Sequence, residues 1–508
     1  MANREELGII RQARAGDVLA RLALGKLYLF GGGSLPTSQA TALHWLQRAA
    51  QQGCAEAWML IGLHISAETA QHEVPAVLRW YERAFDDGVL QAGLVLAQLV
   101  LPQAREGAVA ALRPKALRAL HAAALAGLAD AQWLLARHGV PDAGAPQEAG
   151  GEWLLRAADN GVTEAQYAVL EQAWADAQWY IYLQRALPLA RGLLPAGTGA
   201  TLTPPQVLLM SRCAQAMAQH SEAMAQHAAD AADPAEILLF RESAAQGGDR
   251  AAQLALGLWF ARMDADGARV NAGAGAGIAV ANFKRAIRWL TQAGEQGLAE
   301  AWFALSRVYA KSEFSQRSVK QAQAHLERAA DMGHGAAQLE CGINAWRSRR
   351  DGLDHDVRAA YWLLKAAAQG SAEAETALSR IAPRPAATAW MRQITPLLTR
   401  EHAGSEPWLA ARLELASLFQ LSRAEALLLD VIAADQVHCL VIDIRAIYGR
   451  SKRRLVLLRT AQERQALDRI ARLFDNVDCS PEGPEGNYRQ RLYRLKTWLP
   501  RLTPMAAA

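Results

Sequence analysis

The acidic cluster Asp351, Asp354, His355 and Asp356 is the first candidate for chemistry, because it places three carboxylates and one imidazole within six residues. Divalent cations such as Ca²⁺ bind oxygen ligands of this kind. The spacing of a calcium-binding loop and its distal glutamate are absent, and the cluster falls where we expect a connection between two helices. The sequence therefore predicts no metal site here.

Two glycine-rich segments, residues 31–34 and 273–277, are candidates for a phosphate-binding loop. Such a loop ends in Gly-Lys-Ser/Thr after a strand, and a dinucleotide site needs a strand–helix–strand unit, whereas both segments lie between expected helices. His334 and Cys341 share a helix face without completing a metal site. No hydrolase elbow, zinc-protease motif or kinase signature occurs. We therefore expect no catalytic residue, no cofactor and no enzymatic activity.

Basic residues beside aromatic ones make the C-terminal end a candidate contact site for nucleic acid or for an acidic protein. Cations can neutralise phosphates, and aromatic rings can stack on bases. The simpler interpretation is a solvated hairpin turn and an amphipathic helix whose aromatic residues pack on a small module, and the sequence favours it. The basic residues concerned are Arg450, Lys452, Arg453, Arg454, Arg489, Arg491, Arg494 and Lys496.

The composition indicates which elements must position these residues. The chain has 508 residues, of which 51% are hydrophobic but only 7% aromatic, and about a fifth are alanine. Sheets need β-branched and aromatic residues, so this composition predicts a mainly helical protein. A disordered chain would be less apolar and more highly charged.

The charge is unevenly placed, although the net charge is only +4. From Ala386 to the end there are 18 Lys and Arg against 13 Asp and Glu, and upstream there are 36 against 37. The five cysteines are far apart and form no C-x-x-C pair, which fits a reducing compartment. We find no apolar N-terminal leader and no run of residues able to span a bilayer, and we therefore expect a cytoplasmic protein without membrane contact.

A repeated Gly-x-x-x-Ala pattern organises most of the chain. Six of the eight intervals between successive glycines lie within a few residues of 36, and the other two are 87 and 49. The glycines are Gly16, Gly53, Gly88, Gly127, Gly161, Gly248, Gly297, Gly333 and Gly370.

Other positions keep the same phase. Nine residues after the glycine a small residue recurs, as at Gly25, Gly62, Gly257 and Gly342. The spacing predicts a helix that ends at the glycine, a second helix starting four residues later, and close packing at the small residue. Eight residues before the glycine stands a large residue, which we expect to be buried in every repeat and which is most often tryptophan: Trp45, Trp80, Trp153, Trp289 and Trp362.

These hairpins resemble the Sel1-like repeats, relatives of the tetratricopeptide (TPR) repeats found in many bacterial-type repeat proteins. The clearest matches are Gly297-Leu-Ala-Glu-Ala-Trp-Phe-Ala-Leu-Ser306-Arg-Val-Tyr309 and the segment from Gly352 to Gly370. The resemblance covers about residues 16–381 and implies an α/α superhelical solenoid. It also implies a protein–protein interaction scaffold that binds its partner on a concave face.

We expect two domains: a solenoid over residues 1–385 and an α+β module over 386–508. The long interval between Gly161 and Gly248 has room for two repeats, and we expect irregular structure at about 190–245. A second irregularity is an insert at about 266–279. Pro383 and Pro385 mark the boundary with the module.

The C-terminal module has its own pattern of elements. We expect a helix at 407–419, a capping box from Ser422 to Glu425, and strands within 437–444 and 454–460 that form a hairpin. A second capping box from Thr460 opens a helix that reaches Phe474, and a basic helix follows at 488–498.

The function we expect is a non-enzymatic adaptor whose solenoid binds a protein partner of unknown identity. The alternative is a nucleic-acid-associated factor that uses the basic C-terminal module. The motivating observation for the first is the phase-locked repeat together with the lack of a catalytic motif in the sequence.

Overall fold

The structure is a computed structural model that divides into two compact units, residues Met1–Gly199 with Ala216–Ala231, and Ala200–Gln215 with Ala232–Ala508. Each unit is described by itself. The structure describes residues 4–32, 34–102, 109–138, 149–194, 201–219, 233–270, 281–383, 389–394, 404, 406–444, 453–480 and 482–502.

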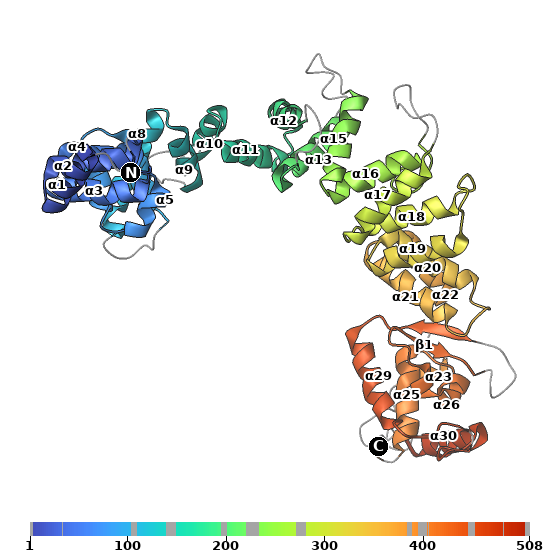
Figure 1. Ribbon diagram of the computed structural model, residues 1–508. Helices are drawn as coiled ribbons and strands as arrows, with labels where there is room; N and C mark the ends of the chain where they lie inside the picture. Colours follow the sequence, from blue (N-terminus) through green and yellow to red (C-terminus); the bar gives the residue numbers. More distant parts are fainter. Residues whose placement is uncertain are drawn as a thin grey trace. The chain divides into compact units, whose positions relative to one another are not determined.

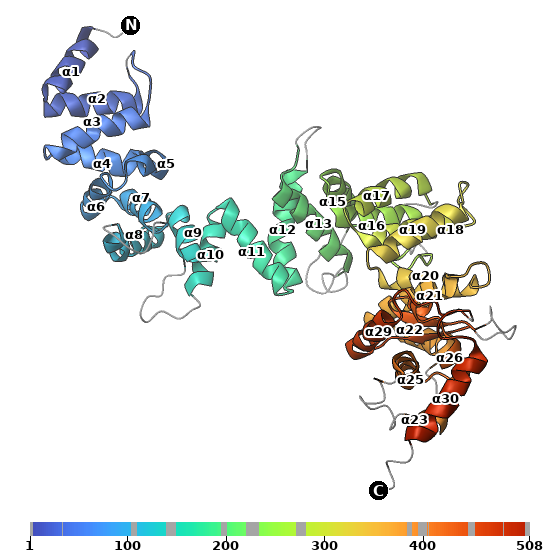
Figure 2. The ribbon, with the colours of Figure 1, turned by 90° about the horizontal axis from the view of Figure 1, so that it is seen from below.

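Both units are built from helices that follow one another as antiparallel pairs (Figures 1 and 2). We call the helix after each repeat glycine the first helix, and the one that ends at the next glycine the second helix. The first helices are α2 (Val18–Phe30), α4 (Ala55–His64), α7 (Leu90–Val100), α9 (Ala129–His138), α11 (Thr163–Ala175), α16 (Arg250–Ala261), α18 (Ala299–Ala310), α20 (Gly335–Arg347) and α22 (Ala372–Ile381). The second helices are α3 (Gln39–Gln51), α6 (Leu78–Asp86), α8 (Arg113–Leu125), α10 (Ala149–Asp159), α15 (Pro234–Gln246), α17 (Phe283–Glu295), α19 (Val319–Asp331) and α21 (His355–Ala368).

Short elements complete the repeat region. Helix α1 (Arg4–Ala15) precedes the first repeat pair and packs on α2. The short elements are α5 (Ala67–Ala70) and two 3₁₀ turns at Gln71–Glu73 and Ala110–Leu112.

The repeat glycines end the second helices, as the spacing predicts. All nine have a φ angle between +87° and +109°, the left-handed region that only glycine enters without strain. The chain can therefore turn sharply into the next first helix.

The next helix begins two residues after the glycine rather than four. The residue between the glycine and the helix is the N-cap. In some repeats its side chain accepts a hydrogen bond from the backbone amide of the repeat alanine, as in Asp249 to Ala252 (2.7 Å) and Ser371 to Ala374 (3.3 Å), whereas Cys54 and Leu298 form no such bond. The methyl group of the repeat alanine is buried, with 0% exposure for Ala57, Ala301 and Ala374.

The core of each repeat lies seven residues before the glycine. Leu46, Leu290 and Leu363 are at most 1% exposed, and each packs against the small residue on the preceding first helix. A methyl group placed on Gly257 would lie 2.5 Å from the Leu290 side chain, and one on Gly342 would lie 2.6 Å from Leu363. The close approach expected at the plus-nine position is therefore confirmed.

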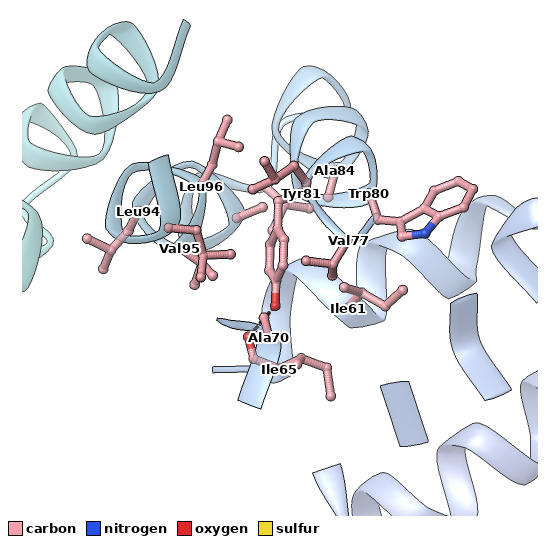
Figure 3. Close-up of a cluster of buried hydrophobic side chains, with 14 of the residues drawn as sticks. Ile61, Ile65, Ala70, Val77, Trp80, Tyr81, Ala84, Leu94, Val95 and Leu96 are labelled. Atoms are coloured by element: carbon pink, nitrogen blue, oxygen red, sulfur yellow. Dashed lines mark hydrogen bonds between the residues drawn. The ribbon is translucent and has the colours of Figure 1, made fainter. Parts of the chain in front are cut away.

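In one repeat of the first unit, the one that ends at Gly88, a tyrosine occupies this core position. Tyr81 is fully buried, and its hydroxyl donates a 3.0 Å hydrogen bond to the carbonyl of Ile65 (Figure 3). Burial raises the pKa of the Tyr81 hydroxyl well above its ordinary value, so it stays a donor. Val77 and Ala84 pack around the same ring.

The expectation that the repeat tryptophan is buried everywhere is wrong for three of the five. Trp80 and Trp362 are buried, whereas Trp45, Trp153 and Trp289 are half-buried. Successive residues are about 100° apart around a helix, so when the minus-seven residue faces the core its neighbour lies at the flank. Arginines cover the flanking rings instead, with guanidinium carbons 5.4, 4.8 and 5.3 Å from the three ring centroids.

A ladder of buried amides links successive repeats. Five residues after the glycine, the side chains of Gln132, Gln253 and Gln338 each donate to a carbonyl at the end of the preceding helix, at 3.1, 3.1 and 3.0 Å. Each then accepts a hydrogen bond of 2.8 to 3.0 Å from the residue just before the next glycine: Asn160, Gln296 and Gln369 respectively. The ladder gives each of these helix-end carbonyls a second hydrogen bond beside the one from the glycine amide, and it pairs the polar groups of the buried glutamines.

The 87-residue interval holds helices without a Gly-x-x-x-Ala anchor. Helix α12 (Trp179–Leu193) follows α11, and α13 (Pro204–Gln219) precedes α15. Ala177, with a φ of 54°, stands at the turn before α12. The expected insert at 266–279 lies partly outside the described residues; its described part is a short turn closed by a bridge between Met263 and Arg269.

The C-terminal module follows its expected element order. Both capping boxes are present: Ser422 with Glu425, and Thr460 with Glu463. The elements are α23 (Ala389–Ile394), α25 (Pro407–Phe419), α26 (Arg423–Leu428), α27 (Val431–Ala434), β1 (Cys439–Ile442), β2 (Arg454–Leu457), α29 (Ala461–Leu473) and α30 (Tyr488–Leu502).

The antiparallel hairpin of β1 and β2 pairs Cys439 with Leu457 and Leu440 with Val456, and it lies between two helical layers (Figure 1). Alternate side chains face opposite ways along a strand. One face, which includes Cys439 and Leu457, packs on α21 and α22, and the other, which includes Leu440 and Val456, packs on α25 and α29. The hairpin therefore covers the apolar face that the last repeat would otherwise expose.

Candidate partner-binding groove

First helices contact one another directly from repeat to repeat, as α4 does with α7, α16 with α18, and α20 with α22. The last of these pairs encloses a groove of about 500 Å³. Ile343 and Trp346 line it from α20, Ala377 and Ile381 line it from α22, and Leu363 of α21 lies beneath them. We call this the α20–α22 groove.

The groove exists because small residues replace large ones in this pair of repeats. Between α18 and α20, Arg307 and Glu340 form a bidentate ion pair that fills the corresponding space. Counted from the repeat glycines, Ile343 stands at the position of Arg307 and Ala377 at that of Glu340. An isoleucine and an alanine cannot bridge the two helices, so an apolar hollow remains.

Charged side chains stand around the apolar floor. Arg347 and Arg380 line the groove together with Glu373. Among the residues that the structure describes, neither arginine forms an ion pair. Arg349 adds a third cation, its guanidinium carbon 4.6 Å from the centroid of the Trp346 ring. The groove thus offers an apolar surface inside a net positive rim.

A second cavity, of about 360 Å³, lies among α19, α20 and α21. It contains Cys341, whose thiol pKa is raised to about 12 by burial, with Glu327 and Glu340 adding to the shift. A thiol with so high a pKa stays protonated at neutral pH and is a poor nucleophile. This cavity offers no reactive group of the kind that the sequence candidates suggested.

The acidic cluster is divided between structural roles. The carboxylate of Asp356 binds the guanidinium of Arg453 at 2.7 and 2.8 Å, and the His355 ring contacts the carbonyl of Ser348 at 2.8 Å. Within the described ranges, no group of three or more His, Cys, Asp and Glu side chains gathers in a metal-binding arrangement. The His334 ring caps α20 and stacks on Phe303, with the ring centroids 4.4 Å apart.

The structure separates the basic residues of the predicted hairpin turn. Arg450 and Lys452 lie outside the described residues. Arg453 binds Asp356 on the last repeat, and these hydrogen bonds raise its pKa. Arg454 forms a bidentate pair with Glu425, both bonds 2.8 Å long. Both described arginines are therefore engaged within the fold.

On α30, the basic residues divide into buried and exposed ones. Arg491 is only 4% exposed and donates to the carbonyls of Leu427 (2.8 Å) and Cys479 (2.7 Å). Arg494 donates to the carbonyl of Glu485 at 3.0 Å. Arg489 and Lys496 are exposed. The expectation that Arg491 contacts a ligand is therefore wrong, because its guanidinium is inside the module.

The aromatic residues of α30 follow the same division. Trp498 is 6% exposed and packs with Leu409 and Leu413, whereas Tyr493 is 69% exposed. A row of aromatic rings on which bases could stack is therefore not formed by these two residues. The simpler interpretation, an amphipathic helix packed on the module, matches this arrangement.

Sequence analysis missed the α20–α22 groove, although a signal was present. The positions six, seven and ten residues after the glycine face the neighbouring first helix, and they hold Phe303, Ala304 and Arg307 in one repeat. From one repeat to the next, Ile343 replaces Arg307 at position ten, and Ala377 replaces Glu340 at position seven. A comparison of these columns would have shown the loss of volume.

Five segments of the chain match a known family model. The family model described as "Sel1 repeat" matches residues 18–54, 129–162, 271–298, 299–334 and 347–371. None of the curated proteins compared with this chain matches it.

Two solved structures are similar to this chain. One is a protective antigen of uropathogenic Escherichia coli strains that displays an SLR fold, with 19% identity, coverage of 97% of both chains and a TM-score of 0.40. The other is a Sel1 repeat protein from Oxalobacter formigenes, with 18% identity, coverage of 74% of this chain and 90% of that one, and a TM-score of 0.25.

Proposed function

Because this chain is built from Sel1 repeats, we propose that it is a non-enzymatic scaffold that binds a protein partner on the face of its first helices. Sel1 repeat proteins are in general protein-interaction scaffolds. The single observation that carries the proposal is the α20–α22 groove, where apolar side chains of adjacent first helices are left open between repeats. We take this first-helix face to be the concave face of the solenoid.

Apolar side chains elsewhere on the first helices support the same face. Phe30 is 56% exposed, and its ring meets the His64 ring edge-on at a centroid distance of 4.9 Å. Met59 and Leu63, both on α4, are 37% and 48% exposed. Exposed apolar residues that gather on one side of a scaffold are typical of interaction surfaces.

Among the described basic residues of the C-terminal module, three are engaged within the fold and do not support the nucleic-acid alternative. Arg453 and Arg454 are paired with carboxylates, and Arg491 is buried. In the part of the chain that the structure describes, no helix has the length and apolar character needed to cross a membrane.

The test is to purify the full chain with its bound proteins at physiological salt and then rebuild the complex from purified components. We expect a stoichiometric complex with at least one protein. A chain that retains no protein and that turns over a small molecule by itself would contradict the proposal.

A further inference from the structure

The α20–α22 groove is apolar and unfilled, unlike the contact between α18 and α20, where Arg307 and Glu340 form an ion pair. Its floor consists of Ile343, Trp346 and Ile381, and its volume of about 500 Å³ lies within the range of pockets that hold a ligand. Because Trp346 and Ile343 are only half-buried, an occupant would cover apolar surface that now faces water.

The rim selects the charge of that occupant. Arg347 and Arg380 stand on opposite helices, and among the described residues no carboxylate pairs with either. The lining of the groove thus holds two guanidinium groups and one carboxylate, that of Glu373. A guanidinium pairs best with a carboxylate or phosphate, and the combination with an apolar floor favours a side chain next to an acidic group.

We propose that the α20–α22 groove binds an acidic peptide segment of a partner protein by one large apolar side chain, with neighbouring carboxylates held by Arg347 and Arg380. This inference rests on the proposed function, because it assumes that the first-helix face binds protein. A peptide fits better than a nucleic acid, since the floor is apolar and a peptide can place an aliphatic or aromatic side chain on it. Binding by one buried anchor and a charged rim is a common arrangement at protein interfaces.

The chain itself supplies a variant that should close the groove without unfolding it. The double substitution Ile343→Arg with Ala377→Glu reproduces the pair that Arg307 and Glu340 form one repeat earlier. Arg380→Glu reverses one rim charge but leaves the floor intact. Lys320→Glu, on the exposed surface of α19, is the matched charge reversal outside the groove.

The test uses a phage-displayed library of random dodecapeptides, selected on the immobilised full chain. We expect selected peptides that carry Asp or Glu next to one Leu, Ile, Met, Phe or Trp. Their affinity should fall at least about tenfold in the double variant and in Arg380→Glu, and less than about twofold in Lys320→Glu. Circular dichroism and the melting temperature of each variant confirm that it is folded.

Three outcomes would overturn the inference: no selected peptide, selected peptides without acidic enrichment, or peptides that bind the double variant as well as the original chain. None of these outcomes would contradict the proposed scaffold function if a purified partner still forms a complex with the chain. The proposed function fails separately, when no protein partner is retained.

Discussion

At the residue scale, the repeat depends on a few positions. The glycine turns the chain, and the methyl group of the alanine four residues later is buried. Gly257 and Gly342 are small because Leu290 and Leu363 occupy the space beside them. The repeat glycine is thus fixed by its positive φ, and the small residue nine positions later by its contact with the following second helix.

Gly257→Ala tests this close approach. The added methyl group would meet the Leu290 side chain at 2.5 Å, so we expect a loss of stability of about 1–3 kcal/mol from overpacking. The matched control is Gly8→Ala on α1, where nothing lies within 4 Å of the new methyl group. That change should stabilise the chain by about 0.5–1 kcal/mol through helix propensity. Chemical denaturation measures both, and equal effects of the two substitutions would refute the packing argument.

Gln338→Met tests the amide ladder. The side chain of Gln338 is 2% exposed and joins the carbonyl of Ala330 to the amide of Gln369, so its removal should cost about 1–3 kcal/mol. Gln321→Met on the exposed side of α19 is the control and should change stability by no more than about 0.5 kcal/mol. Hydrogen exchange at the end of α19 should rise only in the Gln338 variant. Unchanged exchange there would contradict the ladder.

His334 makes stability depend on pH. Burial lowers the pKa of this imidazole, and the nearby Arg307 lowers it further against the opposing effects of Glu300 and Asp266. Its Nδ1 accepts the amide of Ala337, which a protonated ring cannot do. The unfolded chain therefore takes up the proton first, at about pH 6.5, and the contribution of His334 to stability is lost as the pH falls below that value.

The matched variant is His334→Asn, because asparagine caps a helix without titrating in this range. The melting temperature of the original chain should fall more between pH 7.5 and pH 5.5 than that of the variant. A variant that loses as much stability as the original chain over this range would show that other groups cause the dependence.

At the element scale, the β-hairpin is a cap for the last repeat. A terminal repeat has no neighbour on one side and must cover its apolar face by other means. Cys439, Val441, Leu455 and Leu457 supply that cover, and the ion pair between Arg453 and Asp356 fixes the hairpin to the start of α21.

Asp356→Asn tests the docking of the hairpin. Because the Asp356 side chain is only 11% exposed, losing its charge beside Arg453 should destabilise the docked state by about 1–3 kcal/mol. Hydrogen exchange should rise in β1 and β2 before it rises in α18. Asp354→Asn, an exposed residue two positions earlier, should leave exchange unchanged. Equal exchange in both variants would mean that the ion pair does not hold the hairpin.

Much of this element order could be predicted from the sequence, because its signals are local. Helix ends at glycine, capping boxes at Ser422 and Thr460, and alternating apolar strands each depend on residues within a few positions. The outward position of Trp45 and the burial of Arg491 could not be predicted, because they depend on which neighbour covers each side chain. The α20–α22 groove could be predicted in part. The residue changes that open it are visible when the repeats are aligned, but their effect follows only from knowing which helices pack together.

At the scale of the whole molecule, the proposed scaffold meets another protein on the side of its first helices. First helices contact one another between repeats, and the α20–α22 groove lies between two of them. A scaffold of this kind needs no catalytic group, and its specificity depends on the side chains that vary along one face.

Site-specific photo-crosslinking of the full chain in cells tests most directly which face of the helical repeats contacts a protein partner. A photoreactive residue is placed at exposed first-helix positions, Ala336 and Thr376, and at exposed second-helix positions, Lys284 and Gln321. The account predicts protein adducts at Ala336 and Thr376, with little or no product at Lys284 and Gln321. Adducts that form mainly at Lys284 and Gln321 would contradict it.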